Sequence, residues 1–178
     1  GGCGRKSKPD FICEAAFLSR EVKAPVRVQW TREDDLRNSY LHSVAAHHLE
    51  AGLDASGNVT AWLHRSAYPA IGATFAPNVP GAEPDELTNG ASDIPFDVPH
   101  ISVEICPAVA HTRIGWYRSV NAIHHGFAIG SFVDELAFTA RKDSADFLRT
   151  LIGRDRVVAH SFFGFAAVMA LFCFAAGA

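Results

Sequence analysis

The amino-acid sequence predicts an α+β fold, a mixed sheet with a long antiparallel hairpin and helices on its flanks. Apolar and polar residues alternate on both sides of the turn-forming run 54–58, which is typical of a hairpin. Apolar residues recur at helical spacing over 9–23 and again over 122–141. A chain of 178 residues, 48% of them hydrophobic, is long and apolar enough for one domain with a core.

The first third of the chain predicts a helix, a strand and a second helix. Pro9 stands at a favourable first helical position, and an apolar stripe continues to Lys23 before Pro25 ends the helix. Alternation over 26–30 then predicts a strand. Thr31, followed three residues later by Asp34, forms the pattern of a capping box at the start of a short helix.

The rest of the chain predicts the hairpin, a loop, a third strand and two helices. The hairpin strands flank 54–58, and the proline-rich run 69–99 is interpreted as a long surface loop or lid. Alternation over 101–105 predicts the third strand. The following helix presents a stripe of Ala128, Phe132 and Leu136, and a last short helix, capped by Asp143 with Asp146, ends near Ile152.

Composition excludes several classes of protein. The net charge of −3 gives no general attraction to nucleic acid, and the hydrophobic content argues against disorder. The four cysteines (Cys3, Cys13, Cys106 and Cys173) form no Cys-x-x-Cys pair, so a zinc ribbon or an iron–sulfur cluster within this chain is not expected. The chain begins without Met or a signal segment, and we expect it to be an internal or C-terminal piece of a longer one.

The C-terminal tail, residues 153–178, is expected to be separate from the domain over residues 1–152. Its last eighteen residues carry no charge, and as a helix they would span about 27 Å, close to one bilayer core. A membrane anchor is therefore one interpretation. Two other interpretations are a buried helix and an aberrant end, such as a shifted reading frame. Taken together, these two are favoured over the membrane anchor.

Two motif blocks about a hundred residues apart carry the functional signal. The first, 1–6, is a Gly-rich basic loop before a helix, and its free amides suit an anion such as a phosphate. The second is 115–120, followed by 131–137. Taken alone, each block favours an ordinary interpretation: a tight loop before a helix for the first, and a surface salt bridge of Arg118 for the second.

Together with 29–35, and in this order, the blocks resemble the molybdenum-binding large subunit of the xanthine dehydrogenase and aldehyde oxidase family. The resemblance is greatest to the beta subunits of isoquinoline 1-oxidoreductases, and it implies that the domain is a fragment of a molybdopterin-binding domain. Carried over by position, it implies these cofactor-binding residues: Gly1, Gly2, Cys3, Gly4, Arg5, Gly115, Arg118, Ser119 and Val120.

The chain departs from the family pattern at four positions. Cys3 stands where the family has Phe, which puts substrate stacking in doubt. Tyr117 replaces Trp, Asn121 replaces Gly, and Gly130 stands where relatives carry Glu. Asp134 and Glu135 match the family and are interpreted as structural charges, with Arg141 as a candidate partner.

The resemblance implies hydroxylation of an N-heterocycle or aldehyde with oxygen from water, and transfer of electrons to iron–sulfur clusters on a small partner subunit. The molybdenum would be held by its pterin, with a cytosine dinucleotide form implied for this branch, so no protein side chain is expected as a metal ligand. The family's general base, a glutamate, lies beyond this chain, and the isolated chain is expected to be catalytically incomplete.

Three alternatives stay open. The tail and the long loop would fit a membrane-tethered, non-catalytic binding module, and the departures would fit a degenerate fragment that does not fold. Nine histidines raise a third option, a zinc hydrolase. This option is weak, because the adjacent pairs His47–His48 and His124–His125 lack His-x-x-x-His spacing. The compartment stays open between bacterial periplasm and cytoplasm, with membrane association as a further option.

Overall fold

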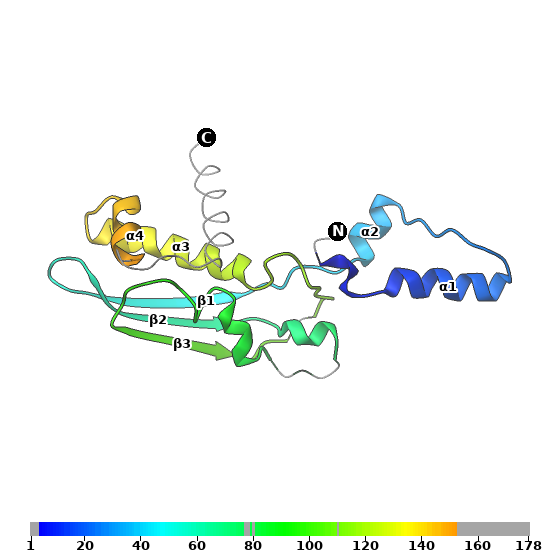
Figure 1. Ribbon diagram of the computed structural model, residues 1–178, viewed down its shortest axis with the longest axis horizontal. Coiled ribbons are helices and arrows are strands. Elements are labelled where there is room, and N and C mark those ends of the chain that lie inside the picture. The colour runs from blue at the N-terminus through cyan, green and yellow to red at the C-terminus, as the bar shows by residue number, and fades with distance from the viewer. Residues whose placement is uncertain (1–3, 77–78, 80, 110, 153–178) are drawn as a thin grey trace.

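A computed structural model describes residues 4–76, 79, 81–109 and 111–152. Figure 1 shows an elongated molecule in which a sheet and two helices lie at one end and two further helices lie at the other. We call residues 10–38, which contain α1 (Asp10–Val22) and α2 (Arg32–Asn38), the arm. We call the sheet together with α3 (Ala122–Thr139) and α4 (Ser144–Ile152) the body.

The sheet confirms the predicted hairpin and its mixed topology. Strand β1 (Ala46–Leu53) pairs antiparallel with β2 (Val59–Ala67), and β2 pairs parallel with β3 (His100–Cys106). At the turn, Asp54 Oδ1 accepts the backbone N–H groups of Ser56 and Asn58 at 2.9 and 2.8 Å. The α+β class predicted from the periodicities is therefore confirmed.

Helix α3 covers one face of the sheet, and α4 packs against α3 (Figure 1). The core forms where Trp62 of β2 meets Phe96 and Phe132, with ring centroids 5.4 and 5.2 Å apart. The buried line of α3 is rotated from the predicted stripe, because Leu136 is buried but Ala128 and Phe132 are only half-buried. Its fully buried apolar residues are Ile129, Val133, Leu136 and Ala137.

The predicted strand over residues 26–30 is wrong. Residues 25–31 belong to no helix or strand and have no ladder partner among the described residues. A strand requires a neighbour to satisfy its backbone, which alternation alone cannot supply. The side chain of Trp30 instead bonds to α1, donating from Nε1 to Glu14 Oε2 at 3.1 Å.

The interpretation of 69–99 as a surface loop or lid is also wrong. The segment contains the 3-10 helices Ile71–Thr74 and Pro84–Thr88. Its buried apolar residues include Ala70, Leu87, Ala91, Ile94 and Phe96. Ile94 and Phe96 belong to the same apolar core as residues of β2 and α3, with Phe96 lying against Trp62.

Local signals at helix ends were predicted well. The capping box is present, since Asp34 N–H donates to Thr31 Oγ1 and Thr31 N–H donates to the Asp34 carboxylate. At the start of α4, Asp143 Oδ1 accepts the N–H groups of Ala145 and Asp146. On α3, Asp134 and Glu135 are exposed, and within the described residues neither forms the ion pair considered with Arg141.

The predicted C-terminal tail lies outside the described residues, so the division of the chain at 152 stays a prediction. Across the part of the chain that the structure describes, no helix combines the length and the hydropathy needed to traverse a bilayer.

Candidate functional site

The two motif blocks meet in the folded chain. Gly4 adopts a left-handed conformation, with φ of 95°, and its Cα lies directly against the backbone of Trp116 and Tyr117. A methyl group on Gly4 would collide with the Trp116 carbonyl. Of the first block, residues 1–3 (Gly1, Gly2 and Cys3) lie outside the described residues, so the structure places only Gly4 and Arg5.

Tyr40 holds the second block in place, a role that the sequence did not reveal. Gly115 is buried against the Tyr40 ring, and a Cβ there would lie 2.5 Å from that of Tyr40. The Tyr117 hydroxyl donates to the Tyr40 carbonyl. Next to it, Leu41 N–H donates to the Arg113 carbonyl at 2.8 Å and Gly115 N–H donates to the Leu41 carbonyl at 3.0 Å. These contacts fix the loop in which Gly115 lies.

Arg5 braces the first loop against the arm. Its guanidinium donates two bonds to the Asp10 carboxylate, at 2.8 and 3.0 Å, and a third to Ser39 Oγ at 3.1 Å. The hydrogen bond from Arg5 holds the pKa of Asp10 below its usual value. The geometry therefore gives Arg5 a positioning role, with most of its donors already engaged.

Arg118 is placed differently. Its side chain is exposed and forms no hydrogen bond or ion pair with any described residue. It precedes two residues with positive φ, Ser119 at 68° and Val120 at 44°. A β-branched residue rarely adopts this conformation, and such strained backbone tends to cluster at ligand sites. Of the two predicted cofactor-binding arginines, Arg118 rather than Arg5 has its donors available to an anion.

A cavity of about 610 Å³ opens beside the joined loops. Lys8 and Arg113 line it, together with the hydroxyl-bearing Thr74 and Thr112, and its described lining residues include no carboxylate. The Arg113 guanidinium lies 5.6 Å from the centroid of the Tyr40 ring. The junction between the loops is itself closed, so an anionic ligand would lie beside it, in a positively charged setting.

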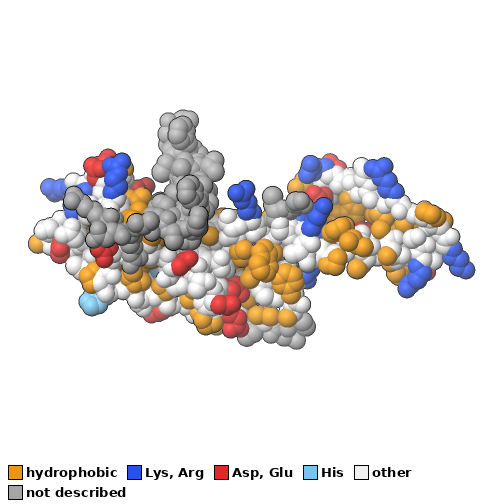
Figure 2. Space-filling view, in the orientation of Figure 1, with side chains coloured by type: hydrophobic (Ala, Val, Ile, Leu, Met, Phe, Trp, Pro, Cys, Tyr) orange, Lys and Arg blue, Asp and Glu red, His pale blue; other side chains and the backbone are white. Residues whose placement is uncertain are grey.

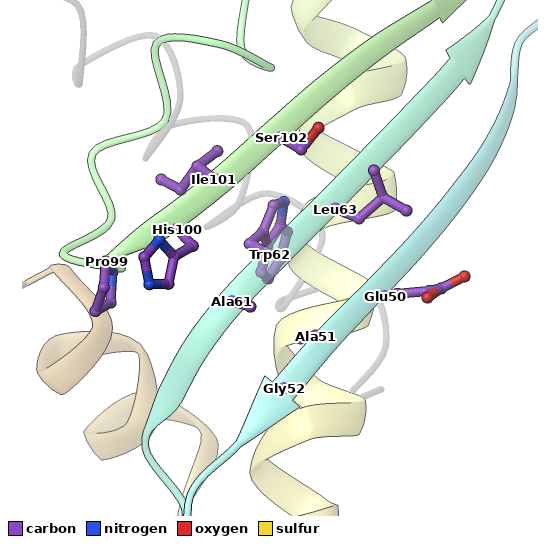
Figure 3. A pocket seen from close by; sticks show the side chains of 10 residues that line it. All are labelled: Glu50, Ala51, Gly52, Ala61, Trp62, Leu63, Pro99, His100, Ile101 and Ser102. Carbon is purple, nitrogen blue, oxygen red and sulfur yellow. The ribbon is translucent and has the colours of Figure 1, made fainter.

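A second, open depression of about 690 Å³ lies on the sheet, lined by residues of β1, β2 and β3 (Figure 3). Its two titratable side chains, Glu50 and His100, come from the outer strands β1 and β3, with β2 between them. Glu50 accepts a hydrogen bond from the exposed His48 at 2.6 Å. On this face the Glu50 carboxylate is therefore paired with His48 of its own strand.

The body also contains a group that sequence spacing did not reveal, the histidine cluster of His47, His64, His124 and His125. Burial is the main cause that lowers the pKa of all four. The pKa of His47 falls to about 4 and that of His64 to about 3, so these rings are neutral at pH 7. Adjacent histidines in sequence were the only visible signal, and only packing brings the four together.

Comparison with known proteins agrees with the motif blocks. Residues 1–150 match the family described as the molybdopterin cofactor-binding domain. One subunit of nicotinate dehydrogenase from Pseudomonas putida is 37% identical over 153 residues, which cover 82% of this chain and 13% of that protein. The beta subunit of isoquinoline 1-oxidoreductase from Brevundimonas diminuta is 29% identical over 152 residues, covering 83% and 19%.

A third relative is the membrane-bound aldehyde dehydrogenase (pyrroloquinoline-quinone) of Gluconacetobacter polyoxogenes, 29% identical over 166 residues, which cover 88% of this chain and 22% of that protein. The chain thus spans less than a quarter of the length of each of these relatives. The family match includes both loops that meet at Gly4, and it confirms the predicted resemblance. The chain belongs to the molybdopterin cofactor-binding domain family.

Proposed function

We propose that this chain forms part of the cofactor-binding wall of a molybdenum hydroxylase large subunit, an oxidoreductase. The observation that carries the proposal is the seating of Gly4 on the backbone of Trp116 and Tyr117, which joins the two family loops. A contact that only glycine permits is expected where backbone must lie close to a ligand or another loop. Family membership supplies the identity of that ligand.

The residues at the joined loops fit an anionic pterin cofactor. When bound, the molybdenum cofactor supplies the oxygen transfer and two-electron chemistry that side chains lack. The exposed Arg118 guanidinium would bind cofactor oxygens in a bidentate manner. Lys8 and Arg113, in the adjoining cavity, would neutralise the phosphates of a dinucleotide form, for which we propose cytosine.

In this proposal, the predicted cofactor-binding residues have different roles. Gly4 and Gly115 would keep the two loops close, while the left-handed turn at Ser119 and Val120 would orient Arg118 and the amides beside it. Arg5 would hold the first loop through Asp10. Gly1, Gly2 and Cys3 stay proposed as cofactor contacts by position in the family motif.

The substrate class is proposed from chemistry shared with relatives. Two relatives are named for nicotinate and isoquinoline, which are N-heterocycles, and a third is named for aldehydes. We propose an N-heterocycle, with an aldehyde as the second option. Electrons would pass to a small iron–sulfur subunit, because the four cysteines of this chain contain no cluster-binding pattern.

The test is the molybdenum and pterin content of the full chain, coexpressed with the small iron–sulfur subunit of its own source. Near-stoichiometric cofactor is expected. Arg118→Gln should lower cofactor retention about tenfold, the loss expected for a charge-assisted bidentate contact. Arg149→Gln is the matched control, because Arg149 is an exposed arginine on α4 whose partner among the described residues is Asp146. Cofactor-free folded protein, or equal retention in both variants, would contradict the proposal.

A further inference from the structure

The histidine cluster gathers residues from three elements at one place. On the sheet, His47 of β1 and His64 of β2 lie on the same face, two residues apart in register, with ring centroids 5.1 Å apart. Helix α3 places His124 and His125 over that face in its first turn. The His47 ring lies 5.1 Å from that of His124 and 5.4 Å from that of His125, measured between centroids.

Burial makes this cluster unusual. His64 and His125 are completely buried, and His47 and His124 are partly buried. The buried atoms His125 Nε2 and His64 Nδ1 have no hydrogen-bond partner. A buried nitrogen without a partner costs free energy, and a bound ion is one way to satisfy it.

The nitrogens are spaced as a metal requires. One ring nitrogen from each of His47, His124 and His125 lies within 4.8 Å of the others. His47 Nε2 and His124 Nδ1 are 3.2 Å apart. Two nitrogens bound to one tetrahedral Zn²⁺ at about 2.0–2.1 Å would be separated by roughly 3.3 Å. The third nitrogen lies within 4.8 Å of these two, and rotation of its side chain would have to bring it closer to complete the set.

The outer contacts orient the same nitrogens inward. His125 Nδ1 lies 3.1 Å from the Asn89 carbonyl, so it carries the proton and leaves the lone pair on Nε2. His124 Nε2 faces Asn121 Oδ1 at 3.4 Å, while Asn121 Nδ2 donates to the Glu86 carboxylate at 3.1 Å. Ligating histidines usually donate their second ring N–H to such carbonyl oxygens.

Glu86 supplies charge compensation next to the cluster. Its carboxylate is buried, accepts the Ile71 N–H at 3.0 Å, and connects to His124 through Asn121. A buried carboxylate near neutral imidazoles would offset the charge of a bound cation.

We propose that His47, His124 and His125 bind one divalent transition-metal ion, with Zn²⁺ as the expected ion. Three neutral imidazole nitrogens and a water in the fourth position match the ligand preference of zinc. The ion would tie β1 to the first turn of α3, while His64 would accept the Nδ1–H of His47, 2.9 Å away. The inference uses residues other than those of the proposed function, and it does not depend on that function.

A metal-free arrangement is the competing explanation. The rings could form a chain of hydrogen bonds in which His64 donates to His47, His47 donates to His124, and His124 donates to Asn121. That chain leaves His125 Nε2 without a partner, whereas a metal ion uses it; His64 Nδ1 gains no partner in either arrangement. The two arrangements therefore differ in the role of His125.

The test is Zn²⁺ titration of the full 178-residue chain after chelation, by calorimetry and by Co²⁺ absorption. One ion per chain is expected, with affinity falling about 100-fold or more in His47→Gln and in His124→Gln. His48→Gln is the matched control, because His48 neighbours His47 on β1 but is exposed and faces away, and its affinity should stay within about twofold. Circular dichroism checks that each variant folds.

X-ray absorption of the zinc-loaded, unmodified chain decides the matter even if the variants fail to fold. Three imidazole nitrogens at about 2.0–2.1 Å would support the proposal. Sulfur in the first coordination shell would assign the ion to the cysteines and overturn it. Absence of stoichiometric binding, or equal loss in His48→Gln, would favour the hydrogen-bonded chain and also overturn it.

Discussion

Helix α1 of the arm and helix α4 of the body are both amphipathic, yet among the described residues only the body has a core. No residue of α1 or α2 is buried, and Phe11, Ile12, Phe17, Leu18 and Val22 of α1 are exposed. Figure 2 shows hydrophobic side chains gathered on the visible surface of the arm. In the body, α4 is of comparable length but buries Phe147 and Leu151 against α3. Periodicity therefore determines which face of a helix is apolar and leaves open what that face contacts.

Local bonds rather than packing define the arm. Its fixed points are the Thr31–Asp34 capping box, the Arg5–Asp10 ion pair and the Trp30–Glu14 hydrogen bond. Bonds of this kind contribute about 1 kcal/mol each, and less when exposed. The body instead depends on apolar burial, where single side chains contribute several kcal/mol.

The largest contrast is expected from truncating one aromatic side chain in each region. Trp62→Ala removes a buried ring that contacts Phe96 and Phe132, so the free energy of unfolding should fall by about 3–5 kcal/mol. Phe17→Ala in the arm should change it by less than about 0.5 kcal/mol, because the side chain is 54% exposed. Urea denaturation measures both, and equal losses would show that the arm is packed in solution.

Mild acid should also distinguish the two regions, because it is expected to lower the stability of the body and not that of the arm. Burial lowers the pKa of His47 to about 4 and of His64 to about 3, below the ordinary 6.5. The unfolded chain therefore binds more protons below pH 6.5, and the stability of the metal-free body is lost as pH falls. The loss should be about 1 kcal/mol per histidine between about pH 6.5 and about pH 5.5.

The arm contains no histidine, and its α1 and α2 should not respond in that range. Hydrogen bonds from Arg5 and Thr31 lower the pKa values of Asp10 and Asp34 below 3.8, so these groups lose their contribution only in stronger acid. Residue-resolved hydrogen exchange at about pH 6.5 and about pH 5.5 distinguishes the regions. Parallel loss of protection in arm and body would contradict this assignment.

Gly4→Ala tests the contact between the two loops, where Gly4 lies against the backbone of Trp116 and Tyr117. The added methyl would collide with the Trp116 carbonyl at a residue with positive φ, which should destabilise the junction by about 1–3 kcal/mol. Amide exchange of Leu41 and Gly115 reports it, because both donate in the bridge beside the loop. Gly72→Ala is the control, since only the Val79 side chain lies near its added methyl, at 3.9 Å.

The smallest effect is expected at the cap of α2. Thr31→Ala removes the side chain that accepts the Asp34 N–H, which should cost about 1 kcal/mol, confined to this helix. The helical chemical shifts of 32–38 measure the loss. Glu33→Gln, a first-turn change that leaves the cap bonds intact, should produce a much smaller shift.

Where a single short segment carries the information, prediction from the sequence succeeded. The hairpin followed from alternation around Asp54, whose carboxylate organises the turn, and α2 followed from the Thr31–Asp34 spacing. Prediction failed where a partner was needed. Residues 26–30 alternate like a strand but have no neighbouring strand in the described part of the chain. Phe96 lies in a segment that the sequence predicts to be a surface loop, and it is buried because it packs against Trp62.

Short stretches of sequence were enough to specify the helix caps, the hairpin and the family, because each depends on residues close in the chain or on motifs read letter by letter. Three-dimensional packing was needed to seat Gly4 on Trp116, to place Tyr40 against Gly115 and to gather the four histidines into one cluster. His47 and His124 are 77 residues apart in the chain. Contacts at that separation depend on how β1, β2 and α3 pack together, which no local spacing encodes.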